Sequence, residues 1–384
     1  MPESLPPELI ELQRIATELA CGPLTDLRRQ FDHKEAGSGP ERAISDRAAL
    51  RDDVVAASTS AGIFGMTQAS VTGEPAASAL ALAVVREALA RHDVVDLPGL
   101  FGPTPGLLAD VGEPIRSQYL EPLLAGKKQG GFGFTEPDGA PRHTWAAVDG
   151  DDLIVNGQKS YVTGGADADF VNTLVEVDGI GPAMVLIDTG TPGVTITRRF
   201  ESLDGSHHAA FQLADVRVPR AHIIGEAGKG MSRAIEQVGQ VRMAIAATSV
   251  GLTAFVVDHV ERYLRAPHRT GTPLGQSERH RLRYGDMRIR AFAARSVLYR
   301  TARLIDSGEN AVNETMAAKH IATETVGHVV DRAIQTVGGQ ALTDGHPLQS
   351  IHRRVRSLRL AEGTSDVLAM NIARGRLDLD RGRL

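Results

Sequence analysis

Glu362, near the C-terminus, is the residue whose surroundings best suit chemistry. Gly363 follows it and interrupts a helical pattern, and residues 364–366 (Thr-Ser-Asp) are good helix-cap and first-turn residues. The first turn of a helix exposes N–H groups without internal partners. A carboxylate at such a joint could act as a general base beside backbone groups that stabilise an oxyanion. On these residues alone, a solvated glutamate at an ordinary helix junction is the simpler interpretation.

The composition argues against several classes of protein. The 384 residues include 42 Lys and Arg against 47 Asp and Glu, and this balance gives no support for a nucleic-acid partner. Cys21 is the only cysteine, which rules out an intramolecular disulfide and a cysteine-based zinc site and suits a reducing compartment. Residues 76–90 are apolar, but Arg86 and Glu87 interrupt them and the run is too short to span a bilayer. We expect a cytoplasmic protein with no membrane partner, and the histidine spacing predicts no metal site.

The spacing of apolar residues changes twice along the chain. Residues 8 to about 125 show helical spacing, residues 130–218 form short strand-like runs between turns, and helical spacing returns over 231–374. Short strands suggest a small barrel or sandwich, and long helices with short links suggest an antiparallel bundle. We therefore predict an α+β multidomain protein with an N-terminal α-helical domain (1–125), a middle β-barrel domain (126–226) and a C-terminal α-helical bundle (227–384).

Residue types also predict local features. Ser45 is expected to cap the second helix, and Asn156-Gly157 is expected to form a hairpin turn. His207-His208 is expected to be a solvated pair in a loop. Strands are expected over 130–134, 153–155, 160–163, 171–177, 183–187, 194–197 and 211–218, and helices over 76–91, 113–124, 231–264, 276–307, 313–337, 347–360 and 365–374.

Several common catalytic motifs are missing from the sequence. It contains no GxGxxG after a strand, no GxxxxGK[ST], no GxSxG elbow and no HExxH. A nucleotide cofactor would therefore need another binding mode. Seven short segments, each weak alone, occur in one order: Phe134-Thr135-Glu136-Pro137, Asn156 to Thr163, Asp215 to Pro219 with the glycine-rich loop 225–230, Arg242 with the Ala-rich helix after it, Gly271 to Leu274, Gln335 to Gly339, and Glu362 to Asp366.

Together these segments resemble the acyl-CoA dehydrogenase family over nearly the whole chain. The resemblance implies non-covalently bound FAD and a tetramer, with an electron-transfer flavoprotein as electron acceptor. Glu362 matches the Glu of the family's "EGTS" signature, the base that takes the α proton of an acyl thioester while the β hydrogen leaves as hydride to flavin N5. Gly363 would let the backbone pass close to the ligand, and Arg242 is placed at the substrate site.

The resemblance also assigns cofactor-binding residues. Phe132, Phe134 and Thr135 map to the segment lining the flavin ring, Thr163 to the hydroxyl that meets N5, and Tyr161, with Val162 beside it, to the aromatic residue next to the ring. Residues Thr364, Ser365 and Asp366 map to a helix start near the flavin, and Gln335, Gly338 and Gly339 to contacts on the adenine side across a subunit interface.

The chain departs from the family pattern at several positions. After "TEP" it has Asp138 to Arg142 instead of Ala-Gly-Ser-Asp. The family's Arg-x-x-Phe-Gly aligns to Pro267, Thr270 and Gly271, so that Arg265 or Arg269 would have to substitute. Gly239 replaces an acid, Ala361 replaces an aromatic residue, and the loop 203–213 is about two residues short.

Two other functions stay open. A flavin-dependent monooxygenase on the same fold is one, although such relatives often replace the base that is kept here as Glu362. The other is a subunit of a hetero-oligomer in which a paralogous chain completes the FAD site, because Pro267 and Thr270 stand where the family has Arg and Phe. We expect an acyl-CoA or acyl-carrier-protein dehydrogenase that forms a homotetramer.

Overall fold

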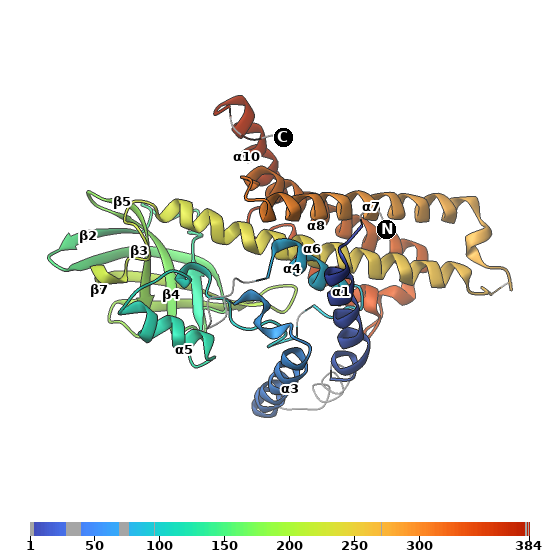
Figure 1. Ribbon diagram of the computed structural model, residues 1–384, viewed down its shortest axis with the longest axis horizontal. Coiled ribbons are helices and arrows are strands. Elements are labelled where there is room, and N and C mark those ends of the chain that lie inside the picture. The colour runs from blue at the N-terminus through green and yellow to red at the C-terminus, as the bar shows by residue number, and fades with distance from the viewer. Residues whose placement is uncertain are drawn as a thin grey trace. The chain divides into compact units, whose positions relative to one another are not determined.

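The computed structural model describes residues 4–27, 40–68, 77–95, 97–269, 271–380, 382 and 384, and within the helix that begins at Pro40 it describes side chains from Leu50 onward. The chain divides into two compact units. One combines Met1–Gly102 with Gly239–Leu384 and is helical, and the other, Pro103–Val238, contains the sheet (Figure 1). The three domain boundaries expected from the sequence stay a prediction, because compactness alone does not test them.

The helical unit consists of long helices with short links. Its described helices are α1 (Pro7–Leu19), α3 (Pro40–Ser60), α4 (Ala79–Ala90), α7 (Glu278–Asp306), α8 (Val312–Val337), α9 (Pro347–Leu358), α10 (Ser365–Leu377) and most of α6 (Gly230–Arg265). The last five match the helices expected in the C-terminal third. Buried side chains of α6, α7, α8 and α9 form one apolar cluster, which holds these helices together.

Helix starts explain two differences from expectation. The helix expected from residue 76 begins at Ala79, because the Ser78 hydroxyl accepts the Ala81 N–H at 3.1 Å and the Asp306 carboxylate accepts the N–H groups of Ala79 and Leu80. The expected cap at Ser45 is wrong. That residue lies inside α3, which begins at Pro40, and a proline in the first turn needs no N–H partner.

The sheet unit holds seven strands in one curled sheet. They are β1 (Gly130–Gly133), β2 (Trp145–Asp149), β3 (Asp152–Thr163), β4 (Phe170–Val177), β5 (Gly181–Asp188), β6 (Val194–Glu201) and β7 (His207–Pro219). The order is β1-β4-β2-β3-β7-β6, with β5 along the other side of β4. β1 and β2 pair with different halves of β4, in parallel. A short helix, α5 (Glu121–Leu124), also belongs to this unit.

The expected hairpin turn at Asn156-Gly157 is wrong, and the strands predicted on either side of it are one strand, β3. The hairpin instead joins β2 to β3 at Gly150-Asp151, next to strand 145–149, which the prediction missed. Asn156 is held in the sheet because its amide exchanges hydrogen bonds with Asp215 of β7, at 3.0 and 2.9 Å. Gly157, at φ 144°, forms a bulge where a Cβ would lie 2.6 Å from Thr144 Cα.

Among the described residues, α6 alone is long and apolar enough to cross a membrane by length and composition. In its most apolar window, 61% of the residues are buried inside the structure. Core side chains such as Val256 and Val260 account for this burial, so the apolar character of α6 is explained by packing within the protein.

Candidate active site

The turn between α9 and α10 carries Glu362. Glu362 has φ 55° and Gly363 has φ 97°, so the chain reverses through two consecutive left-handed residues. A non-glycine residue in this region costs about 1 kcal/mol and persists only where its surroundings fix it. Thr364 then caps α10, its hydroxyl accepting the Val367 N–H at 3.2 Å, as the sequence predicted. The backbone conformation of Glu362 is therefore imposed by its neighbours.

Those neighbours are cations from two other helices. Arg242 Nε on α6 donates to the carbonyl oxygen of Glu362 at 2.9 Å, and Lys319 Nζ on α8 donates to the carbonyl oxygen of Gly363 at 2.9 Å. Lys319 is completely buried. One turn of α8 also places His320 Nδ1 at 3.1 Å from the Ser365 carbonyl oxygen. Both positive charges therefore bind backbone carbonyl oxygens at and directly after Glu362, not the Glu362 carboxylate itself.

The side chain of Glu362 is half-buried. Among the described residues, neither its oxygens nor its backbone N–H has a hydrogen-bond partner. Burial raises the pKa of Glu362, and the charges of Arg242 and Lys319 offset only part of this effect. The result is a carboxylate that is more basic than a solvated glutamate, which is the property that a general base requires.

The sequence did not single out Lys319 or Glu324, and both shape this site. Burial, with help from the charge of Arg242, lowers the pKa of Lys319 to about 8. Glu324 accepts hydrogen bonds from Arg359 Nε at 2.7 Å and from the Ser365 hydroxyl at 2.6 Å, which tie α8 to both ends of the turn. A signal existed for Lys319, because it falls on the apolar stripe of α8, in phase with Ala322 and Val326.

In the sheet unit, two of the recognised segments meet. Lys159 Nζ donates to Glu136 Oε1 at 2.6 Å, and the Thr144 N–H donates to the same oxygen at 2.9 Å. His143 Nδ1 lies 2.7 Å from Glu136 Oε2. Burial would raise the pKa of Glu136, but these bonds hold it at about 2. Glu136 is therefore a permanently ionised structural group that joins "TEP" to β3.

A second bulge, near the C-terminal end of β3, determines which side chains are exposed there. Lys159 pairs with Phe211 and Val162 with Ala209, so β3 has one extra residue here. Tyr161, at φ 54°, turns outward with 64% of its surface exposed, while the Val162 side chain is fully buried. Thr163 is exposed beside Tyr161. An aromatic ring and a hydroxyl thus project together from one strand end, and Val162 can offer a ligand only its backbone.

The prediction of a solvated His207-His208 pair in a loop is wrong in two respects, because both residues lie at the start of β7 and His208 is not solvated. His207 is exposed, but His208 is half-buried, with Nδ1 at 3.3 Å from the Thr163 hydroxyl and Nε2 at 2.9 Å from the Ser206 hydroxyl. Thr163 and His208 are cross-strand partners in the β3–β7 ladder, which is why they meet.

The remaining predicted residues of the sheet unit lie at the end of β1. Phe132 and Phe134 are half-buried and stack on each other, with ring centroids 5.8 Å apart. Thr135 is exposed, and its carbonyl oxygen accepts the Ser160 N–H at 2.9 Å, which fixes this segment against β3.

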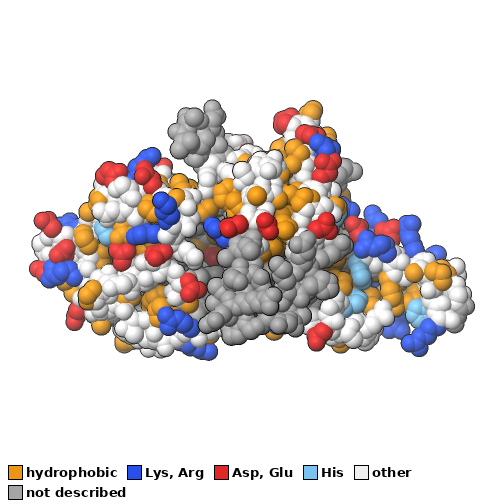
Figure 2. Space-filling view, turned by 90° about the horizontal axis from the view of Figure 1, so that it is seen from below, with side chains coloured by type: hydrophobic (Ala, Val, Ile, Leu, Met, Phe, Trp, Pro, Cys, Tyr) orange, Lys and Arg blue, Asp and Glu red, His pale blue; other side chains and the backbone are white. Residues whose placement is uncertain are grey.

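The predicted adenine-side residues are exposed in the helical unit. Gln335, Gly338 and Gly339 lie at the C-terminal end of α8, and Tyr263 donates to the Val337 carbonyl oxygen there at 3.2 Å. Arg269 lies in the α6–α7 loop, whereas Thr270 is outside the described residues. Basic side chains gather around the α6–α7 loop (Figure 2). The exposed arginines of this loop and of the adjoining parts of α6 and α7 are Arg262, Arg265, Arg269, Arg279, Arg281, Arg288 and Arg290. The positive charge suits an anionic ligand, and its role stays a prediction.

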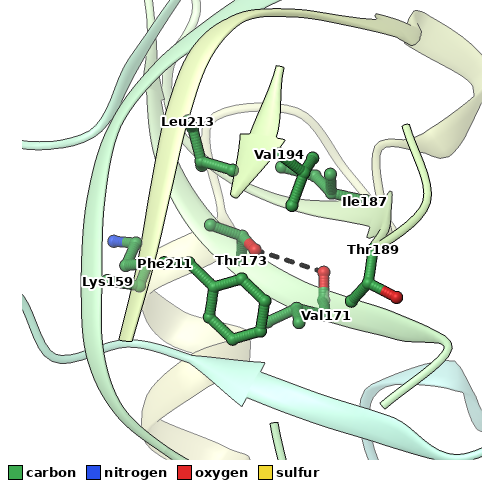
Figure 3. A pocket seen from close by; sticks show the side chains of 8 residues that line it. All are labelled: Lys159, Val171, Thr173, Ile187, Thr189, Val194, Phe211 and Leu213. Carbon is green, nitrogen blue, oxygen red and sulfur yellow. Dashed lines mark hydrogen bonds between the residues drawn. The ribbon is translucent and has the colours of Figure 1, made fainter. Parts of the chain in front are cut away.

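A small cavity lies inside the curl of the sheet. Its lining comes from five strands and the residue after β5, and the Lys159 nitrogen points away from it (Figure 3). Its volume of about 10 Å³ has room for a single water molecule. This cavity therefore accommodates neither an acyl chain nor a flavin.

Sequence comparisons identify the family to which the chain belongs. Residues 131–216 match the model of the acyl-CoA dehydrogenase middle domain, and residues 228–377 match that of the acyl-CoA dehydrogenase C-terminal domain. The fold and the two matched domains thus define a flavin-dependent oxidoreductase. The chain belongs to the acyl-CoA dehydrogenase family, whose members are FAD enzymes.

Individual relatives span most of the chain. It is 27% identical to 3-(aryl)acrylate reductase from Clostridium sporogenes (86% of this chain, 91% of that protein). It is 25% identical to the caffeyl-CoA reductase-Etf complex subunit CarC from Acetobacterium woodii (90% and 95%). A solved protein from Mycobacterium abscessus, assigned to the acyl-CoA dehydrogenases, superposes with a TM-score of 0.83 at 25% identity, covering 98% of this chain and 100% of that one. These findings confirm the predicted family and fold class.

Proposed function

We propose that this protein catalyses the FAD-dependent α,β-dehydrogenation of an acyl thioester, with Glu362 as the base. One observation carries the proposal: the Glu362 carboxylate is half-buried and has no hydrogen-bond partner among the described residues, although two nearby cations donate to the carbonyl oxygens of Glu362 and Gly363. A structural glutamate would be bonded to those cations, as Glu136 is bonded to Lys159.

The roles of the residues follow from this geometry. Glu362 removes the α proton, and its raised pKa makes it a stronger base at neutral pH than a solvated glutamate. The N–H of Glu362, which has no partner among the described residues, is available to the thioester oxygen, where negative charge develops. The positive charges of Arg242 and Lys319 favour the same charge at longer range.

The residues of the sheet unit fit FAD. The exposed Tyr161 ring and Thr163 hydroxyl project together, and such a pair offers a flavin one stacking surface and one hydrogen-bonding group. The cofactor would accept the β hydrogen as hydride at N5. Thr163 would contact N5 and Tyr161 the ring, with Phe132, Phe134 and Thr135 lining the flavin. Thr364 and Asp366 would offer N–H groups at the start of α10, whereas the Ser365 N–H donates to the Arg359 carbonyl oxygen at 3.1 Å.

We further propose that the protein acts in the cytoplasm as a homotetramer and passes its electrons to an electron-transfer flavoprotein. The relative CarC, named as a subunit of a reductase-Etf complex, supports this choice of electron partner. Purification of the chain alone tests the assembly: one FAD per subunit supports a self-sufficient homo-oligomer, and FAD only in the presence of a second chain supports a mixed one.

A second candidate is the same chemistry in reverse, the reduction of an α,β-unsaturated acyl thioester. Both relatives compared above are named reductases. Microscopic reversibility gives Glu362 the same contact with the α carbon, as donor of the proton. Mixing the oxidised enzyme with acyl thioesters, and the dithionite-reduced enzyme with enoyl thioesters, shows which direction is faster. A monooxygenase is disfavoured, because Glu362 is retained.

The test of the base is Glu362→Gln. Bleaching of bound FAD by a panel of acyl-CoAs should become roughly 10²–10⁴-fold slower, the usual range for loss of a general base, with FAD still bound. Glu226→Gln, at an exposed surface pair with Lys229, is the matched control and should bleach like the wild type. If Glu362→Gln is also reduced at the wild-type rate, Glu362 is not the base.

A further inference from the structure

Four side chains of the sheet unit form an unbroken line of hydrogen bonds that starts at Thr163. The Thr163 hydroxyl lies 3.3 Å from His208 Nδ1, His208 Nε2 lies 2.9 Å from the Ser206 hydroxyl, and that hydroxyl donates to Asp204 Oδ1 at 2.6 Å. The dehydrogenation proposed above gives no role to His208, Ser206 or Asp204. The line begins at the hydroxyl that would meet the flavin and ends at a carboxylate.

The His208 ring is held in place by aromatic neighbours. It stacks on Phe200 with centroids 5.4 Å apart and an interplanar angle of 27°, and the edge of Tyr161 lies beside it. Burial lowers the pKa of His208, although the charge of Asp204 and a hydrogen bond with the Tyr161 backbone act in the opposite direction. The other charged or titratable groups nearby are His207 on the same strand and Arg198 and Glu201 on β6. At neutral pH the ring is therefore uncharged and carries one N–H.

Asp204 sets the direction of the Ser206 bond, and the His208 tautomer that fits this bond sets the direction of the other two. An ionised carboxylate can only accept, so the Ser206 proton points at Asp204. The Ser206 oxygen must then accept from His208 Nε2–H, which leaves Nδ1 bare to accept the Thr163 proton. As a consequence, the side of the Thr163 oxygen that faces away from His208 carries only lone pairs. A hydrogen-bond donor would bind there better than an acceptor.

The turn that holds Asp204 and Ser206 is closed without His208. The N–H of Ser202 donates to the Ser206 carbonyl oxygen and the N–H of Gly205 to the Ser202 carbonyl oxygen, each at 2.9 Å. The N–H of Ser206 also donates to Asp204 at 3.0 Å. The contacts of the His208 ring nitrogens are therefore surplus to the fold of this turn.

We propose that Thr163, His208, Ser206 and Asp204 form a proton relay from flavin N5 to solvent. The proposal rests on the proposed function, in which Thr163 meets N5. When the reduced cofactor passes two electrons to the electron-transfer flavoprotein, the N5–H bond breaks and its proton goes to the Thr163 oxygen. The Thr163 proton moves to His208 Nδ1, the Nε2 proton to Ser206, and the Ser206 proton to Asp204, which releases it to water. His208 is a positioning and relay residue, because it acts through Thr163.

Two consequences distinguish a relay from a structural histidine. Reoxidation of the cofactor should depend on His208, whereas its reduction by a thioester, in which hydride arrives at N5, should not. An accepting Thr163 oxygen also favours the N5-protonated, reduced cofactor, so that loss of His208 should lower the midpoint potential.

The experiment compares His208→Leu and Ser206→Ala with His207→Leu in the full-length, FAD-loaded protein. The cofactor is reduced with dithionite, so the measurement needs no acyl substrate, and it is reoxidised by an artificial one-electron acceptor between pH 6 and 9. We expect at least tenfold slower reoxidation in both relay variants and partial rescue of His208→Leu by imidazole. The midpoint potential of His208→Leu should fall by about 30 mV, which corresponds to a tenfold change in the two-electron equilibrium. His207→Leu should match the wild type.

The relay is overturned if His208→Leu and Ser206→Ala reoxidise like His207→Leu and keep its midpoint potential. If His208→Leu does not bind FAD, the Ser206→Ala variant alone tests the relay. This change removes the hydroxyl between His208 and Asp204 and leaves the His208 ring in place. Failure of the proposed function is a separate result: no thioester would bleach the wild-type cofactor, while the dithionite measurements would still report on the relay.

Discussion

Glu136 and Glu362 are both partly buried, both have a buried lysine nearby, and their pKa values move in opposite directions. Lys159 donates directly to the Glu136 carboxylate at 2.6 Å, and the pKa of Glu136 falls to about 2. Lys319 donates to a backbone carbonyl oxygen beside Glu362 at 2.9 Å, and the pKa of Glu362 is raised. Each pair consists of a lysine and a glutamate. The hydrogen bond of Lys159 goes to a carboxylate, whereas that of Lys319 goes to a backbone carbonyl oxygen. A buried lysine that donates to a carboxylate keeps the pKa of that carboxylate low and fixes it as a structural group. A buried lysine that donates to the backbone instead leaves the pKa of the neighbouring carboxylate raised, as a general base requires.

The largest effect is expected from breaking the anchor. Glu136→Leu leaves the Lys159 ammonium, with 2% of its side chain exposed, without its partner. Removing one member of a buried ion pair costs about 3–5 kcal/mol, and we expect a loss of this size in unfolding free energy by urea denaturation. Asp149→Asn, which breaks an exposed pair with Arg217, is the control and should not shift the transition. Equal effects of both changes would contradict the anchor role.

An intermediate effect is expected from Lys319→Met. The charge of Lys319 lowers the pKa of Glu362, so its removal should raise that pKa further and move the acid limb of thioester-driven flavin reduction to higher pH. The pKa of Lys319 is about 8 in the folded protein against an ordinary 10.5. Between pH 8 and pH 10.5 this lysine is protonated in the unfolded chain and deprotonated in the folded protein. The unfolding free energy of the wild type should therefore rise by about 3 kcal/mol as the pH increases through this range.

Lys319→Met should lack that rise in stability. Lys229→Met, at an exposed pair with Glu226, is the matched control and should keep both the rise and the wild-type acid limb. A Lys319→Met profile that overlays the wild type would show that the cation does not influence Glu362.

The smallest effect is expected from Gly363→Ala. At φ 97° a Cβ would be strained, and it would lie 3.2 Å from Leu368 Cδ2 and 3.4 Å from an Arg242 guanidinium nitrogen. We expect a loss of about 1–2 kcal/mol in stability, with slower flavin reduction because Arg242 is displaced from the Glu362 carbonyl oxygen. Gly139→Ala, where a Cβ would meet no atom within 4 Å, is the control and should change neither. Thermal melts and stopped-flow reduction measure the two effects.

The sequence predicted most of what depends on local residue pattern. The five C-terminal helices, the Thr364 cap and the Glu362 turn all follow from apolar spacing and capping residues within a few positions. The family and the fold class are confirmed for the same reason, because seven such segments occur in one order. The catalytic and cofactor roles stay predictions.

The sequence failed where the outcome depends on a distant strand or helix. Asn156-Gly157 has the residues of a hairpin turn, but Asp215, 59 positions away, holds it inside a strand. His208 looked like a solvated residue because only the β3–β7 register places Thr163 opposite it. Lys319 was overlooked because a lysine on a helix is usually solvated, and only packing shows that it is buried beside Gly363.

Three residues of α8, Lys319, His320 and Glu324, contact the segment from Arg359 to Ser365. Successive helix residues differ by about 100° in direction, so a one-residue insertion or deletion between Lys319 and Glu324 would turn one contact away from the others. Length changes in this family member should therefore be tolerated at the loop before α8 or beyond Val337, and rejected within that single turn and a half. The spacing of these three side chains along α8 therefore limits where the chain can change length without disturbing the turn that carries Glu362.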